Sequence, residues 1–372
     1  MLSSTHRFIK ITLLIYLVIT LDRQILSAFQ TPSGLSKEDI LLKEAGKDGK
    51  EKWLTASVRG GIHSVAVSGL LNIAQMPKEL KTLHEANCHY IALAGKHFVR
   101  IYLVRPSEKQ KLLFVEKIFS QNTVRAVTFS GNNGYVAYGD YDGEVFLYKI
   151  TGHKSKRKHN QRIHRKRLHI GRVNSVKISQ DNKILVSGGA DGSVKAWNLK
   201  TWQSYTLHRH QNSVTQVLIS SNYIVSTSYD RTIMIYDMRT REKRLLGLKS
   251  GDKISLHSHW ISGASISEDG KTVLSSGYDR QVIQWTLVDR DTVTSSTVGR
   301  HFASIYRMFQ SSKGDLLVSI DLDGTVRVWK AGAVSSSSRR EKGLVTGMGI
   351  SPDGTRRYSI DNRGELRVQS LN

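Results

Sequence analysis

The chain has 372 residues and a formal net charge of +24, from 55 lysines and arginines against 31 aspartates and glutamates, an excess that favours anionic partners. A single cysteine, Cys88, excludes an intramolecular disulfide, and its place in the apolar run CHYIALAG predicts a buried core thiol. The sequence has no glycine-rich phosphate loop, no Cys and His set at metal-binding spacing and no isolated carboxylate pair. These absences argue against an enzyme, a cofactor or a metal.

Residues 1–30 have the features of a targeting segment. Arg7 and Lys10 precede eleven apolar or threonine residues, ITLLIYLVITL, and small residues lie near Ala28. This order predicts a cleaved signal peptide and a secretory or extracytoplasmic route. Eleven residues are few for a membrane span, and the alternatives are an uncleaved anchor or a plastid or mitochondrial presequence. Residues 31–50 are polar and predict a linker.

From residue 62 onward the sequence consists of short alternating strands separated by Gly, Asn, Asp and Ser turns. The clearest unit contains NSVKIS, ILVSGG, SVKAWNL and WQSYTLH in succession. Four short strands make a small antiparallel sheet whose faces are buried only by stacking on neighbouring sheets. We count seven units, with a loop at 153–169 between the second and third. Their expected limits are about 62–118, 123–150, 172–207, 213–247, 260–297, 303–334 and 344–372.

An aspartate recurs in the turn before the third strand of five units, at intervals of 49, 39, 49 and 44 residues: Asp142, Asp191, Asp230, Asp279 and Asp323. Around the last four lie a serine four residues before, an aromatic residue six after and a histidine twenty or twenty-two before. These are Ser187, Ser226, Ser275 and Ser319; Trp197, Tyr236, Trp285 and Trp329; and His169, His210, His259 and His301. A catalytic triad is needed once, whereas this set occurs four times, so we expect a structural role.

The other three units lack parts of the pattern. Lys96 and Arg363 occupy the aspartate position of the first and last units. The second unit has Tyr138 at the serine position and no upstream histidine. We therefore expect three degenerate units.

In these residues the chain resembles the WD-repeat family. The resemblance implies an all-β, seven-bladed β-propeller in which an Asp-His-Ser-Trp network stabilises each complete blade. The implied networks are Asp191, His169, Ser187 and Trp197; Asp230, His210, Ser226 and Tyr236; Asp279, His259, Ser275 and Trp285; and Asp323, His301, Ser319 and Trp329. The last unit stops at Asn372 after its third strand, so we expect residues 51–58, EKWLTASV, to pair with it and close the ring.

The resemblance also implies that the residue before each blade aspartate lies on the narrow face of the ring, where partners commonly dock. Six residues are expected to form a partner-binding rim there: Tyr141, Tyr229, Arg231, Trp260, Tyr278 and Arg280. Tyr, Trp and Arg are enriched at interface hot spots, and arginines suit an acidic or phosphorylated peptide. The alternative is that these aromatic residues only pack locally.

Residues 153–169, HKSKRKHNQRIHRKRLH, form a strongly basic run without an acid. We interpret eight of them as a candidate polyanion site: Lys154, Lys156, Arg157, Lys158, Arg162, Arg165, Lys166 and Arg167. Without interleaved aromatic residues, the run could hold phosphates but would not read bases. The alternatives are a merely solvated loop and a nuclear localisation signal; the latter conflicts with the N-terminal segment, which we favour.

We therefore predict a non-catalytic interaction scaffold that binds a protein partner through the rim and has no small-molecule substrate. The alternative is a ribonucleoprotein or chromatin component that binds nucleic acid or another polyanion through residues 153–169. A steep dependence of binding on salt distinguishes this second class from the first.

Overall fold

A computed structural model describes residues 40–41, 43–48, 51–58, 61–68, 70–71, 88–105, 111–150, 162–220, 222–247, 257–267, 269–288, 292–310, 316–330, 339–340 and 343–370. The targeting segment expected at residues 1–30 lies outside this described part. Within it, no helix is long and apolar enough to span a membrane.

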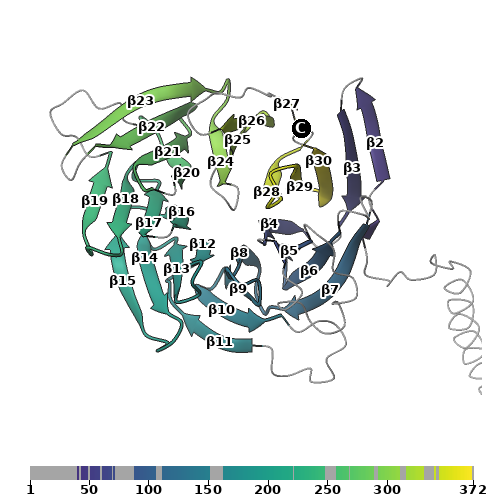
Figure 1. Ribbon diagram of the computed structural model, residues 1–372, viewed down its shortest axis with the longest axis horizontal. Coiled ribbons are helices and arrows are strands. Elements are labelled where there is room, and N and C mark those ends of the chain that lie inside the picture. Colours follow the sequence, from purple (N-terminus) through teal and green to yellow (C-terminus); the bar gives the residue numbers. More distant parts are fainter. Residues whose placement is uncertain are drawn as a thin grey trace, which may run out of the picture. The chain divides into compact units, whose positions relative to one another are not determined.

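Seven antiparallel sheets, the blades, form a ring (Figure 1). Blade one contains β4 (Ile62–Val67), β5 (His89–Gly95), β6 (Phe98–Val104), β7 (Lys111–Phe119) and β1 (Ile40–Leu41). Blade two contains β8 (Val124–Phe129), β9 (Tyr135–Asp140), β10 (Glu144–Lys149) and β11 (Arg162–Arg167). Blade three contains β12 (Val173–Ile178), β13 (Ile184–Gly189), β14 (Ser193–Asn198) and β15 (Ser204–Arg209).

The other four blades continue the ring in chain order. Blade four contains β16 (Val214–Ile219), β17 (Tyr223–Ser228), β18 (Ile233–Asp237) and β19 (Lys243–Leu246). Blade five contains β20 (Ile261–Ile266), β21 (Thr272–Gly277), β22 (Gln281–Leu287) and β23 (Val293–Arg300). Blade six contains β24 (Ile305–Gln310), β25 (Leu316–Asp321), β26 (Thr325–Lys330) and β27 (Arg339–Arg340). Blade seven contains β28 (Val345–Ile350), β29 (Arg356–Asp361), β30 (Glu365–Ser370), β3 (Glu51–Ser57) and β2 (Lys43–Asp48).

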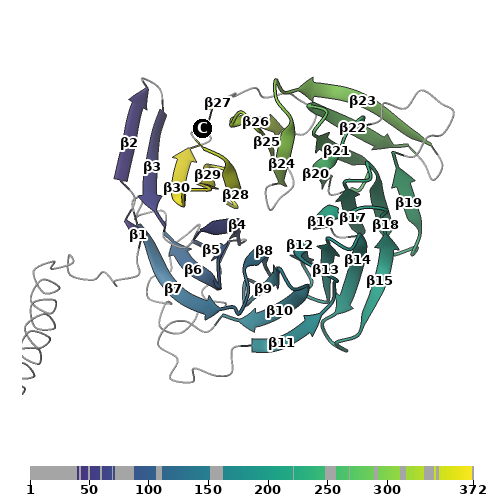
Figure 2. The same cartoon turned by 180° about the vertical axis from the view of Figure 1, so that it is seen from behind.

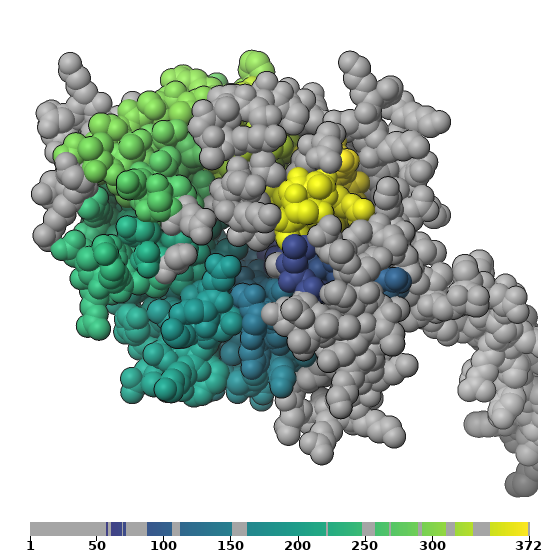
Figure 3. Space-filling view, viewed as in Figure 1, coloured from purple at the N-terminus to yellow at the C-terminus, as the bar shows by residue number. Residues whose placement is uncertain are grey.

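The hydrophobic core lies between neighbouring blades. One cluster joins Val145 and Leu147 of blade two to Val173, Leu185 and Trp197 of blade three. Such cores need both faces of a sheet to be apolar, which is why the strands are rich in valine and isoleucine. The side chains of blades two to five form a continuous surface, coloured blue-teal to green in the space-filling view (Figure 3).

The ring is closed by the N-terminal strand β3, as predicted. β3 pairs antiparallel with β30, with Trp53 opposite Gln369 and Ser57 opposite Glu365. Figure 2 shows the same arrangement from behind, with β3 beside β30 and β2 on the outside. The amide of Val58 then donates to the carbonyl of Gly364 at 2.7 Å, which links the strand end to the last blade.

The prediction of a linker at residues 31–50 is wrong for the residues of this range that the structure describes. Lys43–Asp48 forms β2, which pairs with β3, and Ile40–Leu41 forms β1, which pairs with β7. An edge strand is held by main-chain hydrogen bonds, and charged residues are tolerated there because they discourage pairing with another molecule. A polar composition therefore did not exclude a strand.

Each innermost strand begins with the same irregularity. The register shifts between the first and third residues of all seven strands β4, β8, β12, β16, β20, β24 and β28. Such a bulge places two residues opposite one and re-aims the side chains beside it. In β4, β12 and β16 the first residue is buried and the next two remain partly exposed.

Removing the closing strands tests their contribution. A chain that begins at residue 61 lacks β1, β2 and β3, so it should lose roughly 4 kcal/mol or more of unfolding free energy relative to a chain that begins at residue 40. It should also aggregate, because β30 then becomes an exposed edge. Denaturant titration with light scattering measures both effects. Equal stability and solubility of the two chains would show that closure is dispensable.

Candidate functional site on the turns of blades three to six

A buried carboxylate holds the turn between the second and third strands of blade three. Nδ1 of His169 lies 3.0 Å from Oδ1 of Asp191, and its Nε2 lies 2.7 Å from Oγ of Ser187. Asp191 also accepts hydrogen bonds from the amides of Ile170 and Ser193, both at 3.1 Å. The predicted network is therefore present except for Trp197, whose Nε1 has no acceptor in the described part of the chain.

Blade four repeats this arrangement. Nδ1 of His210 lies 3.3 Å from Asp230, and Nε2 lies 2.8 Å from Oγ of Ser226. Burial alone would raise the pKa of Asp230, but hydrogen bonds from His210 and Thr232 outweigh burial and hold its pKa below the usual range. Tyr236 packs against the neighbouring apolar cluster.

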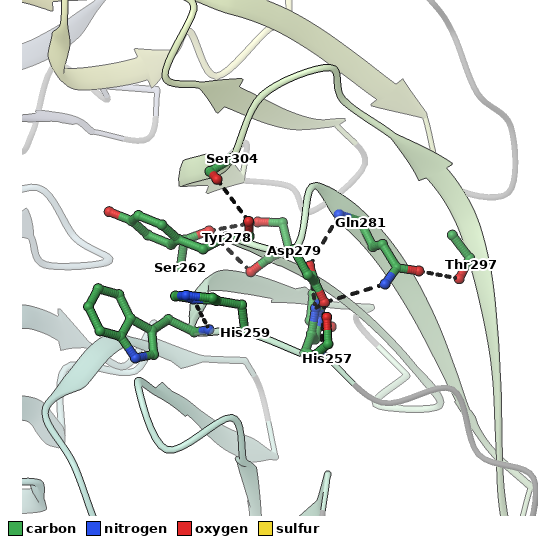
Figure 4. A network of polar contacts seen from close by, with 12 residues as sticks. His257, His259, Ser262, Tyr278, Asp279, Gln281, Thr297 and Ser304 are labelled. Carbon is green, nitrogen blue, oxygen red and sulfur yellow. Dashed lines mark hydrogen bonds and ion pairs between the residues drawn. The ribbon is translucent and has the colours of Figure 1, made fainter.

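The histidine predicted for blade five is wrong: His257, not His259, completes the network. Nδ1 of His257 lies 2.8 Å from Asp279 and its Nε2 lies 2.8 Å from Ser275, to which Trp285 donates at 2.7 Å. Figure 4 shows His257 directed at Asp279, with His259 beside Tyr278 instead. Because a carboxylate only accepts hydrogen bonds, Nδ1 of His257 donates to Asp279. The Ser275 hydroxyl accepts from the indole of Trp285 and donates to Nε2, so the ring proton of His257 lies on Nδ1.

A sequence signal would have selected the correct histidine. The network histidines lie four residues before the first residue of the next innermost strand, as in His210 before Val214 and His301 before Ile305. His257 has this relation to Ile261, whereas His259 is two residues too close. Counting back from the aspartate allowed either, because both intervals occur in the chain.

The aspartate predicted for blade six is also wrong. Asp321, at the end of β25, lies 2.9 Å from Nδ1 of His301, whereas Asp323 is exposed. Ser319 and Trp329 occupy their predicted places, with Trp329 donating to Ser319 at 2.7 Å. Asp321 accepts hydrogen bonds from the amides two and four residues later. These bonds fold the turn around its carboxylate and place it beside His301.

In blades two and seven, as in blade six, the aspartate that holds the turn lies two residues before the predicted position. In blade two, Asp140 accepts from Asn122 at 3.3 Å, while the predicted Asp142 accepts from Asn122 at 2.8 Å. In blade seven, Asp361 receives Arg367 at 3.2 Å and its turn contains Arg363 at the position expected for an aspartate. The signal for this second kind of turn is an aspartate three residues before a glycine with positive φ, as at Gly143.

Comparison with known protein families finds the WD domain, G-beta repeat, over residues 160–198, 202–237, 250–286 and 293–330. These four segments cover the blades whose networks are complete in His, Ser and Asp. Residues 160–330 therefore contain four WD repeats. Comparison with curated protein sequences finds no match.

Three of the six residues expected at the rim of this WD-repeat propeller are in contact. The ring of Trp260 lies 4.8 Å from that of Tyr229 and 5.4 Å from that of Tyr278, measured between centroids. His259 joins them, 5.0 Å from Trp260 and 5.8 Å from Tyr278. We call Tyr229, Trp260, Tyr278 and His259 the aromatic rim.

The main chain positions these rings. The amide of Tyr278 donates to the carbonyl of Trp260 at 2.8 Å, and Ser304 of blade six donates to the carbonyl of Tyr278 at 2.8 Å (Figure 4). The amide of Tyr229 likewise donates to Ser213 at 3.1 Å. The aromatic rim is therefore fixed by the turns that the network aspartates stabilise.

The other three predicted rim residues lie outside this contact. Arg231 and Arg280 are exposed, follow the network aspartates of blades four and five, and have φ of 71° and 68°. Tyr141 lies on blade two, where the guanidinium of Arg125 is 5.7 Å from its ring centroid. The sequence prediction missed two features here: His259 as a rim residue, and Arg125 beside Tyr141.

The basic run is not wholly a loop, in contrast to the prediction. Arg162–Arg167 forms β11, the fourth strand of blade two, with Arg167 opposite Glu144. Arg165 pairs with Glu144 at 2.7 Å, and His164 stacks on Trp202 with ring centroids 4.5 Å apart. Arg162 and Arg167 are exposed and Lys166 is partly exposed. The other four predicted cations, Lys154, Lys156, Arg157 and Lys158, lie outside the described residues.

Two neighbouring histidines test the assignment in blade five. His257→Ala leaves the buried Ser275 and Asp279 without their shared partner, so it should cost roughly 2–4 kcal/mol of unfolding free energy. His259→Ala removes an exposed ring and should cost less than about 0.5 kcal/mol. Equilibrium denaturation of both variants measures the difference. A larger loss for His259→Ala would return the network to the histidine first predicted.

Proposed function

We propose that the protein is a non-catalytic scaffold that binds a protein segment across the turns of blades four and five. The observation that carries the proposal is the contact of Tyr229, Trp260 and Tyr278, in which Trp260 remains 43% exposed. WD-repeat propellers commonly serve as protein-interaction scaffolds. Rigid, partly exposed aromatic residues supply contact area at little entropic cost, which makes them effective binding anchors.

The charges beside the aromatic rim favour an acidic or phosphorylated segment. Arg231 and Arg280 occupy equivalent, exposed positions in adjacent blades. The nearby carboxylates of Asp230 and Asp279 face His210 and His257 and are held by them. The two guanidinium groups are thus available to carboxylates or phosphates of a partner, which arginine binds in a bidentate manner.

Substitution at the rim tests this function. Trp260→Ala should weaken binding of a captured partner by about 2 kcal/mol or more, since Trp260 is the central exposed ring. Phe119→Ala is the matched control, because Phe119 is 73% exposed but lies on β7 of blade one. Titration of the purified partner against both full-length variants measures the effect. Equal affinities for the two variants would place the interface elsewhere.

A second candidate function is polyanion binding along β11, favoured by the exposed Arg162 and Arg167 on one outer strand. Joint substitution of both by glutamine should reduce the salt dependence of heparin or RNA binding by about two counterions. Joint substitution of Arg231 and Arg280 is the control of equal charge change. If the control reduces the salt dependence equally, the polyanion does not bind specifically at β11.

A further inference from the structure

Three basic residues of the innermost strands come from blades far apart in the ring. They are His63 on β4, Arg125 on β8 and Arg307 on β24. Each lies at the bulge where its strand begins, and each residue is partly exposed. Blades two and six are separated by two blades on one side and by three on the other, and β8 and β24 face each other across the ring axis (Figure 1).

The charges of these residues nevertheless act on one another. Burial first, then Arg125 and Arg307, lower the pKa of His63; burial and then Arg125 lower the pKa of Arg307. Side chains from opposite blades can interact in this way only near the axis. Tyr229 and Tyr278 also act on Arg307, so this axial cluster of His63, Arg125 and Arg307 lies beside the aromatic rim.

Nothing in the described part of the chain neutralises the two arginines. The seven innermost strands contain no aspartate or glutamate, and β12 adds a further cation, Lys177. Among the described residues, Nε of Arg125 is buried and has no hydrogen-bond acceptor. Crowded, unpaired like charges destabilise a fold, and arginine remains charged. An arrangement of this kind is complementary to an anion, which would remove the repulsion.

We propose that the ring axis carries an oxyanion-binding site, in which Arg125 and Arg307 hold a phosphate or carboxylate group between them. Its position next to Tyr229 and Tyr278 would let a side chain of a segment bound at the aromatic rim reach it. Delivery of the oxyanion by a bound segment rests on the proposed function, whereas binding of a free oxyanion at the axis does not.

Inorganic pyrophosphate is the probe for the site. Calorimetry at low salt should detect binding to the full chain, with a melting temperature that rises with pyrophosphate concentration. Arg125→Gln and Arg307→Gln should each weaken the affinity at least about tenfold, as expected when a charged hydrogen-bond donor is lost. Arg239→Gln changes the net charge equally at the exposed turn after β18 of blade four and should alter the affinity by less than about twofold. Equal weakening by all three variants, or no binding to the wild type, would overturn the site.

Lost binding must be separated from misfolding. Without pyrophosphate, Arg307→Gln should melt at or above the wild-type temperature, because it removes a repulsive charge. Arg307→Lys keeps the charge but loses the bidentate donor, so its affinity should lie between those of the wild type and Arg307→Gln. Wild-type affinity in a folded Arg307→Gln variant would contradict the assignment.

Competition identifies the source of the oxyanion. Displacement of pyrophosphate by inorganic phosphate alone would indicate a phosphorylated segment, and displacement by glutarate as well would indicate acidic side chains in general; displacement by neither would refute a functional site. Trp260→Ala should retain pyrophosphate affinity. If it also retains partner binding, the proposed rim function fails while the axial site stands.

Discussion

The pairing of β3 with β30 is the interaction on which the rest of the propeller depends. Each blade buries one face against the preceding blade and the other against the next, so an open ring would leave two apolar faces in water. The N-terminal strand prevents this by joining the C-terminal blade, from Trp53 opposite Gln369 to Ser57 opposite Glu365. Closure also has a consequence at the centre. It turns innermost strands distant in sequence, β4, β8 and β24, toward one axis.

In blades two to seven, the carboxylate of one aspartate fixes the turn between the second and third strands. Asp279 connects His257 to the amides of Ser258 and Gln281, and the turn between β21 and β22 can therefore adopt only one arrangement. Tyr278 immediately precedes this aspartate, so the group that stabilises the blade also sets the position of a rim residue. Stability of the blade and the position of the aromatic rim are therefore physically coupled in blades four and five.

The fold was predictable because the same strand pattern occurs in seven units. The single residues that complete each network were harder to predict. Seven strand patterns and a missing last strand together required a ring closed by residues 51–58. In contrast, two histidines in blade five and two aspartates in blade six fit a His–Asp interval of twenty or twenty-two residues. The position of the next strand or of the turn glycine identifies the residue that forms the network.

The basic run shows how charge can conceal a strand. Its composition indicated a solvated loop, but a strand is built by main-chain pairing, and blade two lacked a fourth strand in the prediction. Tyr229, Trp260 and Tyr278 could be grouped from the sequence because turn positions are local, whereas His259 of the aromatic rim was assigned to the network instead. The electrostatic interaction of Arg125 with Arg307 could not be predicted, because it depends on the completed ring.

The chain's positive charge is therefore organised rather than uniform. Arg165 is paired with Glu144, and Arg367 with Asp361 and Glu365, so these cations contribute to blade structure. Arg125 and Arg307 have no such carboxylate partner in the described part of the chain, although burying a charged group costs free energy. Tyr229 and Tyr278 contact Trp260, and their phenol groups also act electrostatically on Arg307, which links the aromatic rim to the axial cluster. On the proposed function, an apolar platform near two arginines would favour a segment that supplies both hydrophobic contact and negative charge.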